Sequence, residues 1–261
     1  MFAFLRFVED LAVGLGRPLD LIAATFAEKP RGLTSMKAYP IAAYRERIVR
    51  QIEEGNVIFL ELFSMKRRTG YVLYEWDIQA DLGTESQDHR FCLLGVSNSI
   101  FPSGNDFVDV MLPKLSPFFS PISYGLALCM PRRFLPAGFA TGLAQANMPR
   151  ELDLEANAWL QGLRDRCDNE LRNVFGANIL NAKHLEIPVG DVPLGEWIRC
   201  GPYRGGLDQL SDRLWLWSFR EGNGNGYLKW NSRELVYVRR ALIAHGVFNW
   251  RLLPHYAMQL D

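Results

Sequence analysis

The chain has 261 residues, of which 48% are apolar; this excludes a disordered protein and suits one large domain or two small ones. Basic and acidic residues number 29 each, so the chain lacks the basic surplus that general nucleic-acid binders use to displace counterions from phosphates. A local basic patch is compatible with this balance.

The N-terminus is apolar, but it lacks the pattern of a secretory signal. Glu9 and Asp10 stand where an uninterrupted apolar core is required, and Arg6 is the only early cation. No uncharged apolar run approaches the roughly 18 residues needed to cross a bilayer. We therefore expect a cytoplasmic protein that is neither exported nor embedded in a membrane.

Three helices are predicted in the first 55 residues. Apolar residues at helical spacing indicate a helix that ends near Gly14 or Gly16. A proline at position 18 favours a second, short helix over residues 18–27. A third helix is predicted over residues 40–54, with one apolar stripe, a charged opposite face and Gly55 as its cap.

Three strands follow, at residues 56–63, 71–80 and 91–96, with polar connections at 66–70 and 81–90. In the second strand, apolar and acidic residues alternate, which is typical of a half-buried antiparallel strand. The pattern places Trp76 and Ile78 on the packed face, and Glu75 and Asp77 on an exposed face. Short links between sequential strands favour a meander, packed by the helix over residues 40–54.

The second half is predicted from weaker signals. We expect a helix over residues 106–112, strands at 122–130 and 139–143, a long helix from Asp153 to Gly176, and a short helix over 192–199. A strand at 214–219 and a glycine-rich turn at 222–226 follow. A capping box at residues 231–234 opens a last helix that ends at Gly246.

These elements predict an α+β fold, in which an antiparallel meander is packed by flanking helices. We expect one domain over residues 1–261, with the one candidate boundary near residues 145–152.

No sequence motif for catalysis or cofactor binding is present. The four histidines form no metal-binding pair, the nucleophile motif Gly-x-Ser-x-Gly is absent, and the four cysteines form no Cys-x-x-Cys pair. The glycine clusters at 14–16 and 222–226 lack the strand and lysine context of a phosphate loop. We therefore expect free thiols and no catalytic, cofactor or metal residue.

The densest charged feature is an acidic stretch at residues 75–88, which contains five carboxylates and no basic residue. Such a stretch can be a solvated sheet face, a docking patch for a basic protein, or a site for Mg²⁺ or acid–base catalysis. We take the docking patch as the working hypothesis. The candidate partner-binding residues are Glu61, Glu75, Asp77, Asp81, Glu85 and Asp88.

Scattered segments of the second half resemble a known class of bacterial proteins. The segments are LRNVFGANILNAKHL at 171–185, LGEWI at 194–198, LWLW at 214–217 and VRRALIAHG at 238–246. They are similar to the C-terminal layout of immunity proteins encoded beside secreted toxins of type VI secretion and other polymorphic-toxin systems. The resemblance covers about residues 120–250. It implies a protein that binds one cognate toxin and occludes the toxin's active site. Immunity proteins of this class share no catalytic residues.

Two functions stay open from the sequence. The first is a toxin-neutralising immunity protein, whose toxin would act in the cytoplasm and could be a nuclease. The second is an enzyme of unrecognised type, such as a hydrolase that uses the acidic stretch. For the immunity protein, an alternative docking surface is formed by the helices or by residues 230–250. The oligomeric state stays open.

Overall fold

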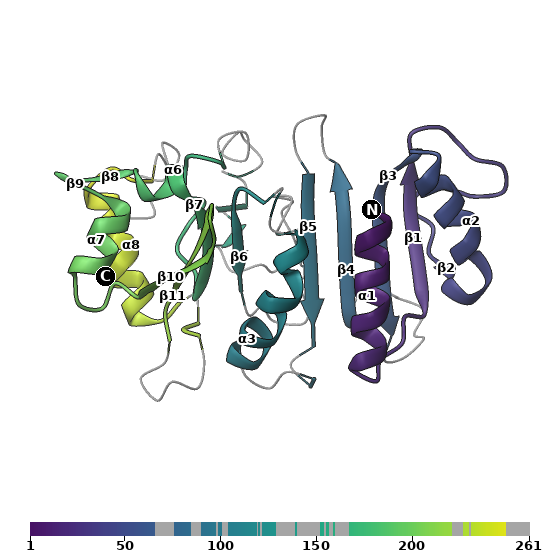
Figure 1. The fold of residues 1–261 in the computed structure, drawn as a ribbon, viewed down its shortest axis with the longest axis horizontal. Helices are drawn as coiled ribbons and strands as arrows, with labels where there is room; N and C mark the ends of the chain where they lie inside the picture. Colours follow the sequence, from purple (N-terminus) through teal and green to yellow (C-terminus); the bar gives the residue numbers. More distant parts are fainter. Residues whose placement is uncertain are drawn as a thin grey trace. The chain divides into compact units, whose positions relative to one another are not determined.

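We describe the protein from a computed structural model (Figure 1). The description covers residues 1–65, 76–84, 90–97, 99–100, 104–118, 120, 122–128, 139, 152–153, 155–156, 159, 167–220, 227–229 and 231–248. None of the helices in these ranges combines the length and the apolar character needed to cross a membrane.

The chain divides into two compact units, which are described separately. The first comprises residues 1–101 and 132–140, and the second comprises residues 102–131 and 141–261. Both units combine helices with antiparallel strands, so the predicted α+β class is confirmed. The candidate boundary near 145–152 lies almost wholly outside the described residues, and a single domain over the chain stays a prediction.

The first unit is built on a five-stranded antiparallel sheet with the order β2-β1-β3-β4-β5. Its elements are α1 (Phe2–Gly14), β1 (Leu21–Phe26), β2 (Tyr39–Pro40), α2 (Ile41–Glu53), β3 (Val57–Met65), β4 (Trp76–Thr84) and β5 (Arg90–Val96). Figure 1 shows α1 and α2 on one side of this sheet. The helix α1 buries Leu5, Val8 and Ala12 completely, which explains its helical apolar stripe.

The predicted meander of β3, β4 and β5 is confirmed, and its register fixes which side chains share a face. Leu62 lies opposite Ala80, whereas Glu61 lies opposite Asp81. Because side chains alternate along a strand, the aliphatic pair and the acidic pair point to opposite faces of the sheet. The predicted helix over residues 40–54 is also confirmed as α2, which packs on β1 and β3.

Two predictions for the first unit are wrong. Residues 21–26, predicted as part of a helix, form β1 between β2 and β3. Its Ile22, Ala23 and Ala24 are all buried, so both faces are apolar and no strand alternation is visible. Residues 81–84, predicted as loop, continue β4 and pair with both neighbouring strands. Residues 66–75 and 85–89 lie outside the described part of the chain.

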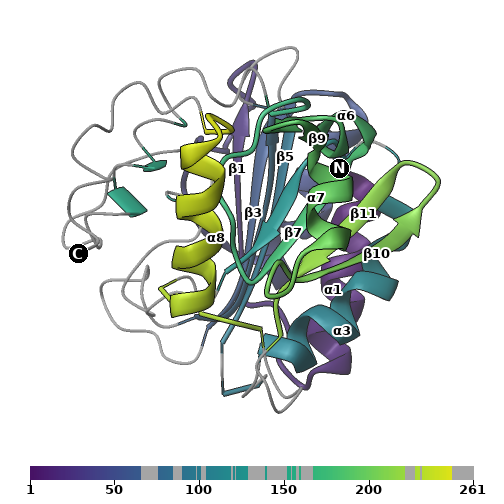
Figure 2. The same ribbon diagram turned by 90° about the vertical axis from the view of Figure 1, so that its left-hand side faces the viewer.

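The second unit contains a four-stranded antiparallel sheet with the order β10-β11-β7-β6. Its elements are α3 (Gly104–Leu115), η2 (Ser116–Phe118), β6 (Gly125–Ala127), β7 (Ala177–Asn181), α6 (Ala182–Leu185), β8 (Pro188–Val189), β9 (Val192–Pro193), α7 (Leu194–Cys200), β10 (Gly206–Ser211), β11 (Leu214–Ser218) and α8 (Arg233–Ala244). One sheet face carries Leu180 and Trp217 in a core with α7 and α8, which flank these strands in Figure 2. The other face places Leu216 against Val108 of α3.

The strongest signals of the second half are confirmed. The strand at 214–219 is β11, and the short helix over 192–199 is α7. The last helix is α8, but the predicted cap is off by one residue. The N-cap is Ser232, whose side chain accepts a hydrogen bond from the Leu235 backbone amide, and not Asn231. The predicted helix over 106–112 is α3, which continues through Pro113.

The predicted long helix to Gly176 is wrong at its C-terminal end. Residues 171–175 have no regular structure and lead directly into β7. Buried side chains replace the missing helical hydrogen bonds: Arg239 donates from Nη2 to the Val174 carbonyl oxygen at 2.6 Å, and Asn178 donates to that of Phe175 at 2.8 Å. Of the strand predicted at residues 122–130, only Gly125–Ala127 form a strand, β6, within the described residues. Phe139 was predicted in a strand and is helical. Residues 140–143 and 222–226 are outside the described ranges.

Candidate functional site

The structure separates the acidic residues that the sequence groups together. Glu61 and Asp81 are direct neighbours across β3 and β4. Asp77 lies near the start of β4, and its side chain pairs with Arg17 at 3.0 Å between Nε and Oδ2. Glu75, Glu85 and Asp88 lie outside the described residues, and their assignment as partner contacts stays a prediction.

The expected exposure of Asp77 is wrong. Asp77 is 4% exposed and Asp81 is 0% exposed. The alternation of acidic and apolar residues suggested one wet face, but β4 lies between β3 and β5 and is covered on both faces. Consequently, neither carboxylate can present its charge on the surface of this protein.

Glu61 and Asp81 form a pair of carboxyl groups with unusual proton affinity. The Gln79 amide donates to Asp81 Oδ2 at 2.9 Å, whereas Asp81 Oδ1 has no hydrogen-bond partner among the described residues. Burial, with the negative charge of Glu61 second, raises the pKa of Asp81 well above its usual range. Burial also raises the pKa of Glu61. The pair could therefore donate a proton. For metal binding, the described ranges contain no group of three or more potential ligands.

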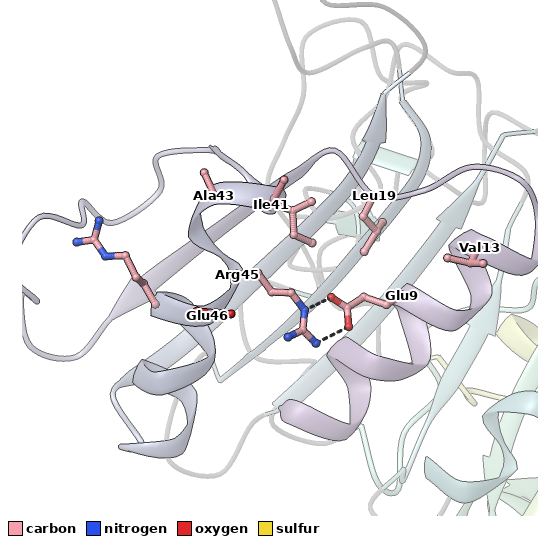
Figure 3. A pocket seen from close by; sticks show the side chains of 9 residues that line it. Glu9, Val13, Leu19, Ile41, Ala43, Arg45 and Glu46 are labelled. Atoms are coloured by element: carbon pink, nitrogen blue, oxygen red, sulfur yellow. Dashed lines mark hydrogen bonds and ion pairs between the residues drawn. The ribbon is translucent and has the colours of Figure 1, made fainter.

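An open groove of about 770 Å³ lies between α1 and α2 on the first unit (Figure 3). Val13, Leu19 and Ile41 supply apolar lining, and Arg45 bridges the groove by donating two hydrogen bonds to Glu9. The Arg45 Nη2 to Glu9 Oε2 distance is 2.8 Å. These two charges satisfy one another, while the charged side chains of Glu46 and Arg47 also line the groove beside its apolar residues.

Beside this groove, the loop of residues 27–38 presents Met36 to solvent. Met36 is 76% exposed and has φ of 60°, in the left-handed region that side chains other than glycine rarely adopt. Hydrogen bonds fix the loop at Met36 and just before it. The Met36 amide donates to the Ala24 carbonyl at 3.0 Å, and the Thr34 amide donates to Tyr39 Oη at 2.8 Å. These bonds impose the backbone conformation at Met36.

The second unit contains a loop of the same kind at residues 201–205. Tyr203 is 79% exposed and has φ of 63°. Its neighbour Arg204 stacks over the Trp197 ring at 4.1 Å and donates to the Trp197 carbonyl at 2.8 Å. The Trp217 indole donates in turn to the Arg204 carbonyl at 2.6 Å. Two buried tryptophans thus hold the residue that follows Tyr203.

Within the described residues, Met36 and Tyr203 are the only non-glycine residues with positive φ, and they are also the two most exposed large apolar side chains. The next most exposed are Val13 at 70% and Tyr237 at 61%. Sequence reasoning missed both residues, because neither backbone strain nor exposure has a local sequence signature. The alternative surface at 230–250 is described only in part, and residues 230 and 249–250 lie outside.

Comparisons with known proteins identified no relative of this chain. No family model, no curated protein and no solved structure matches the chain. The residues and contacts of the chain itself are therefore the basis for its function.

Proposed function

We propose that this chain is an immunity protein, which acts in the cytoplasm by binding a cognate secreted toxin and occluding its active site. The observation that carries the proposal is the coincidence of strain and exposure at Met36 and Tyr203. A non-glycine residue in the left-handed region costs on the order of 1–3 kcal/mol and persists where the surroundings impose it, often at binding sites.

The chemistry of these two side chains suits protein recognition. Tyrosine combines a large apolar ring with a polar end and is enriched among the residues that dominate binding energy. Methionine is flexible and polarisable, so it adapts to the surface that it meets. Because hydrogen bonds and cation–π stacking already order both loops, binding would immobilise little additional chain.

The proposed contact differs from the one that the sequence suggested. Asp77 and Asp81 are buried, so they support the sheet rather than meet a toxin. Glu61 is partly buried in β3. The proposal therefore takes the loop 27–38 of the first unit and the loop 201–205 of the second as separate candidate contacts for the toxin, and it makes no use of a nucleic acid or a membrane.

The test uses the protein encoded in the adjacent reading frame. We expect that expression of this neighbour arrests bacterial growth, that co-expression of this chain restores growth, and that Tyr203→Ala weakens protection. Tyr237→Ala is the matched control, because Tyr237 is an exposed tyrosine in the regular backbone of α8. A harmless neighbour, or arrest that this chain does not relieve, would refute the immunity function.

One observation favours the second candidate, an enzyme such as a hydrolase. Glu61, which is only partly buried, lies opposite the buried Asp81, and both carboxyl groups have raised pKa values, so Glu61 could act as a general acid beside Asp81. Hydrolysis of a substrate panel that is abolished by Asp81→Asn would support the enzyme. Under the immunity proposal, Asp81→Asn leaves growth protection unchanged, because this buried side chain cannot reach a toxin.

A further inference from the structure

A concentrated positive charge lies on the first unit, although the chain as a whole is neutral. Residues 29–50 contain six basic residues and one acidic residue. We define the basic surface as Lys29, Arg31, Lys37 and Arg47, which are all exposed and surround Met36 in sequence. One of its cations, Lys37, lies over the ring of Tyr39 in β2, with Nζ 5.3 Å from the ring centre.

The helix α2 and the loop 27–38 form this surface as one body. Arg47 Nη2 donates to the Arg31 carbonyl oxygen at 3.0 Å. The same guanidinium lies against Gly32, where a side-chain Cβ would come within 2.8 Å of Arg47 Nη2. Gly32 has φ of 70°, a backbone conformation that favours glycine, and a side chain there would displace the end of Arg47. The loop is therefore held against α2.

The charges of this surface are available to a partner. Arg45, which lies nearby, is neutralised by Glu9. In contrast, no carboxylate of the described residues forms an ion pair with Lys29, Arg31, Lys37 or Arg47. The acidic side chains near it in sequence are Glu28 and Glu46, both exposed. The surface thus carries a net positive charge, and it adjoins the groove through Arg47, which belongs to both.

We propose that the basic surface, Met36 and the groove between α1 and α2 together dock an acidic segment of a protein. Carboxylates of the segment would pair with the four cations, and its apolar side chains would contact Met36 and the groove lining at Val13 and Ile41. The inference rests on the proposed function, since the segment would belong to the toxin. Fixed cations around an apolar centre increase both association rate and selectivity for such a segment.

A protein fits this surface better than a nucleic acid does. Binding of single strands relies on exposed aromatic rings between the cations. Here Tyr39 is buried, and Tyr44 is partly buried with the Arg47 guanidinium 5.4 Å from its ring centre. The exposed apolar side chain is Met36, which has no flat ring for a base.

The test measures fluorescence anisotropy of a labelled helical peptide of glutamate and leucine, with the full-length chain as titrant. We expect saturable binding that weakens several-fold between ~50 and ~200 mM salt. An Arg31→Glu, Lys37→Glu double variant should weaken binding about tenfold or more and reduce the salt dependence. Met36→Ala should weaken binding without changing the salt dependence. Arg233→Glu is the control and should bind like wild type, since Arg233 is an exposed arginine of the second unit.

Absence of peptide binding, or equal loss in the Arg233→Glu control, would overturn the proposal. Tighter binding to duplex DNA of matched length would overturn it in favour of a nucleic acid. Growth protection that persists without peptide binding would refute this surface and leave the immunity function standing. Peptide binding without growth protection would support the surface and refute that function.

Discussion

The backbone at Met36 and Tyr203 occupies a region that costs a side-chain-bearing residue about 1–2 kcal/mol. We therefore predict that Met36→Gly leaves the free energy of unfolding within about 1 kcal/mol of wild type, because relief of strain offsets the greater chain entropy of glycine. Tyr237→Gly, in the interior of the regular helix α8, should instead lose about 1 kcal/mol or more. Urea denaturation measures both. An equally large loss for Met36→Gly would show that the side chain stabilises the fold.

At Asp81, burial has a consequence for the dependence of stability on pH. The folded pKa lies above the unfolded value, so the folded state favours the protonated carboxyl. Its contribution to stability is full at pH below the unfolded pKa of about 3.9 and is lost as pH rises through the folded pKa. Asp81→Asn should thus raise stability at pH 7 by about 1–3 kcal/mol and change little near pH 3. Lower stability of Asp81→Asn at pH 7 would contradict this account.

His184 should make stability depend on pH in the opposite sense, with stability falling as the pH drops. It is fully buried, and its Nδ1 accepts a hydrogen bond from the Asn181 amide. Desolvation by burial lowers the pKa of His184 to about 4. The unfolded state binds a proton first, so stability falls as pH drops from about 6.5 to about 4, by about 3 kcal/mol in total. Proton NMR titration tests this directly, and an ordinary pKa near 6.5 for His184 would refute it.

Among the elements, the irregular segment 171–175 depends on a buried ion pair. Arg172 Nε donates to Glu155 Oε1 at 2.7 Å, and the Asn173 amide donates to Glu155 Oε2 at 2.9 Å. Arg172→Met leaves the buried Glu155 carboxyl without its cation, so the variant should lose about 3–5 kcal/mol of stability. The double variant Glu155→Gln, Arg172→Met should recover part of that loss. Denaturation of both variants measures the coupling, and purely additive losses would show that the pair is not coupled.

The elements that were predictable are those with a local cause. The apolar stripes of α1 and α2 and the start of α8 each lie within one short segment of sequence, although the N-cap of α8 is Ser232 and not the predicted Asn231. In contrast, β1 and β10 were missed. The first is apolar on both faces, and the second is a mostly exposed strand that pairs only with β11. Their strand character comes from neighbours distant in sequence, which a local pattern does not contain.

At the scale of the whole molecule, the candidate site was the part least accessible from sequence. The acidic stretch was visible, but the burial of Asp77 and Asp81 depends on how the whole first unit covers β4. Strain at Met36 depends on hydrogen bonds to β1 and Tyr39. Only the basic surplus of residues 29–50 could have been counted beforehand, and the neutral total charge concealed it.

In the proposed function, this chain binds a toxin through the strained, exposed loop 27–38 of the first unit, the loop 201–205 of the second, or each of them separately. Hydrogen–deuterium exchange of the full chain, with and without the neighbouring toxin, tests it most directly, because each backbone amide reports its own protection. We predict that binding slows exchange in at least one of the two loops while the amides of α8 around Tyr237 keep their rates. Protection confined to other segments, with both loops exchanging as in the unbound protein, would contradict it.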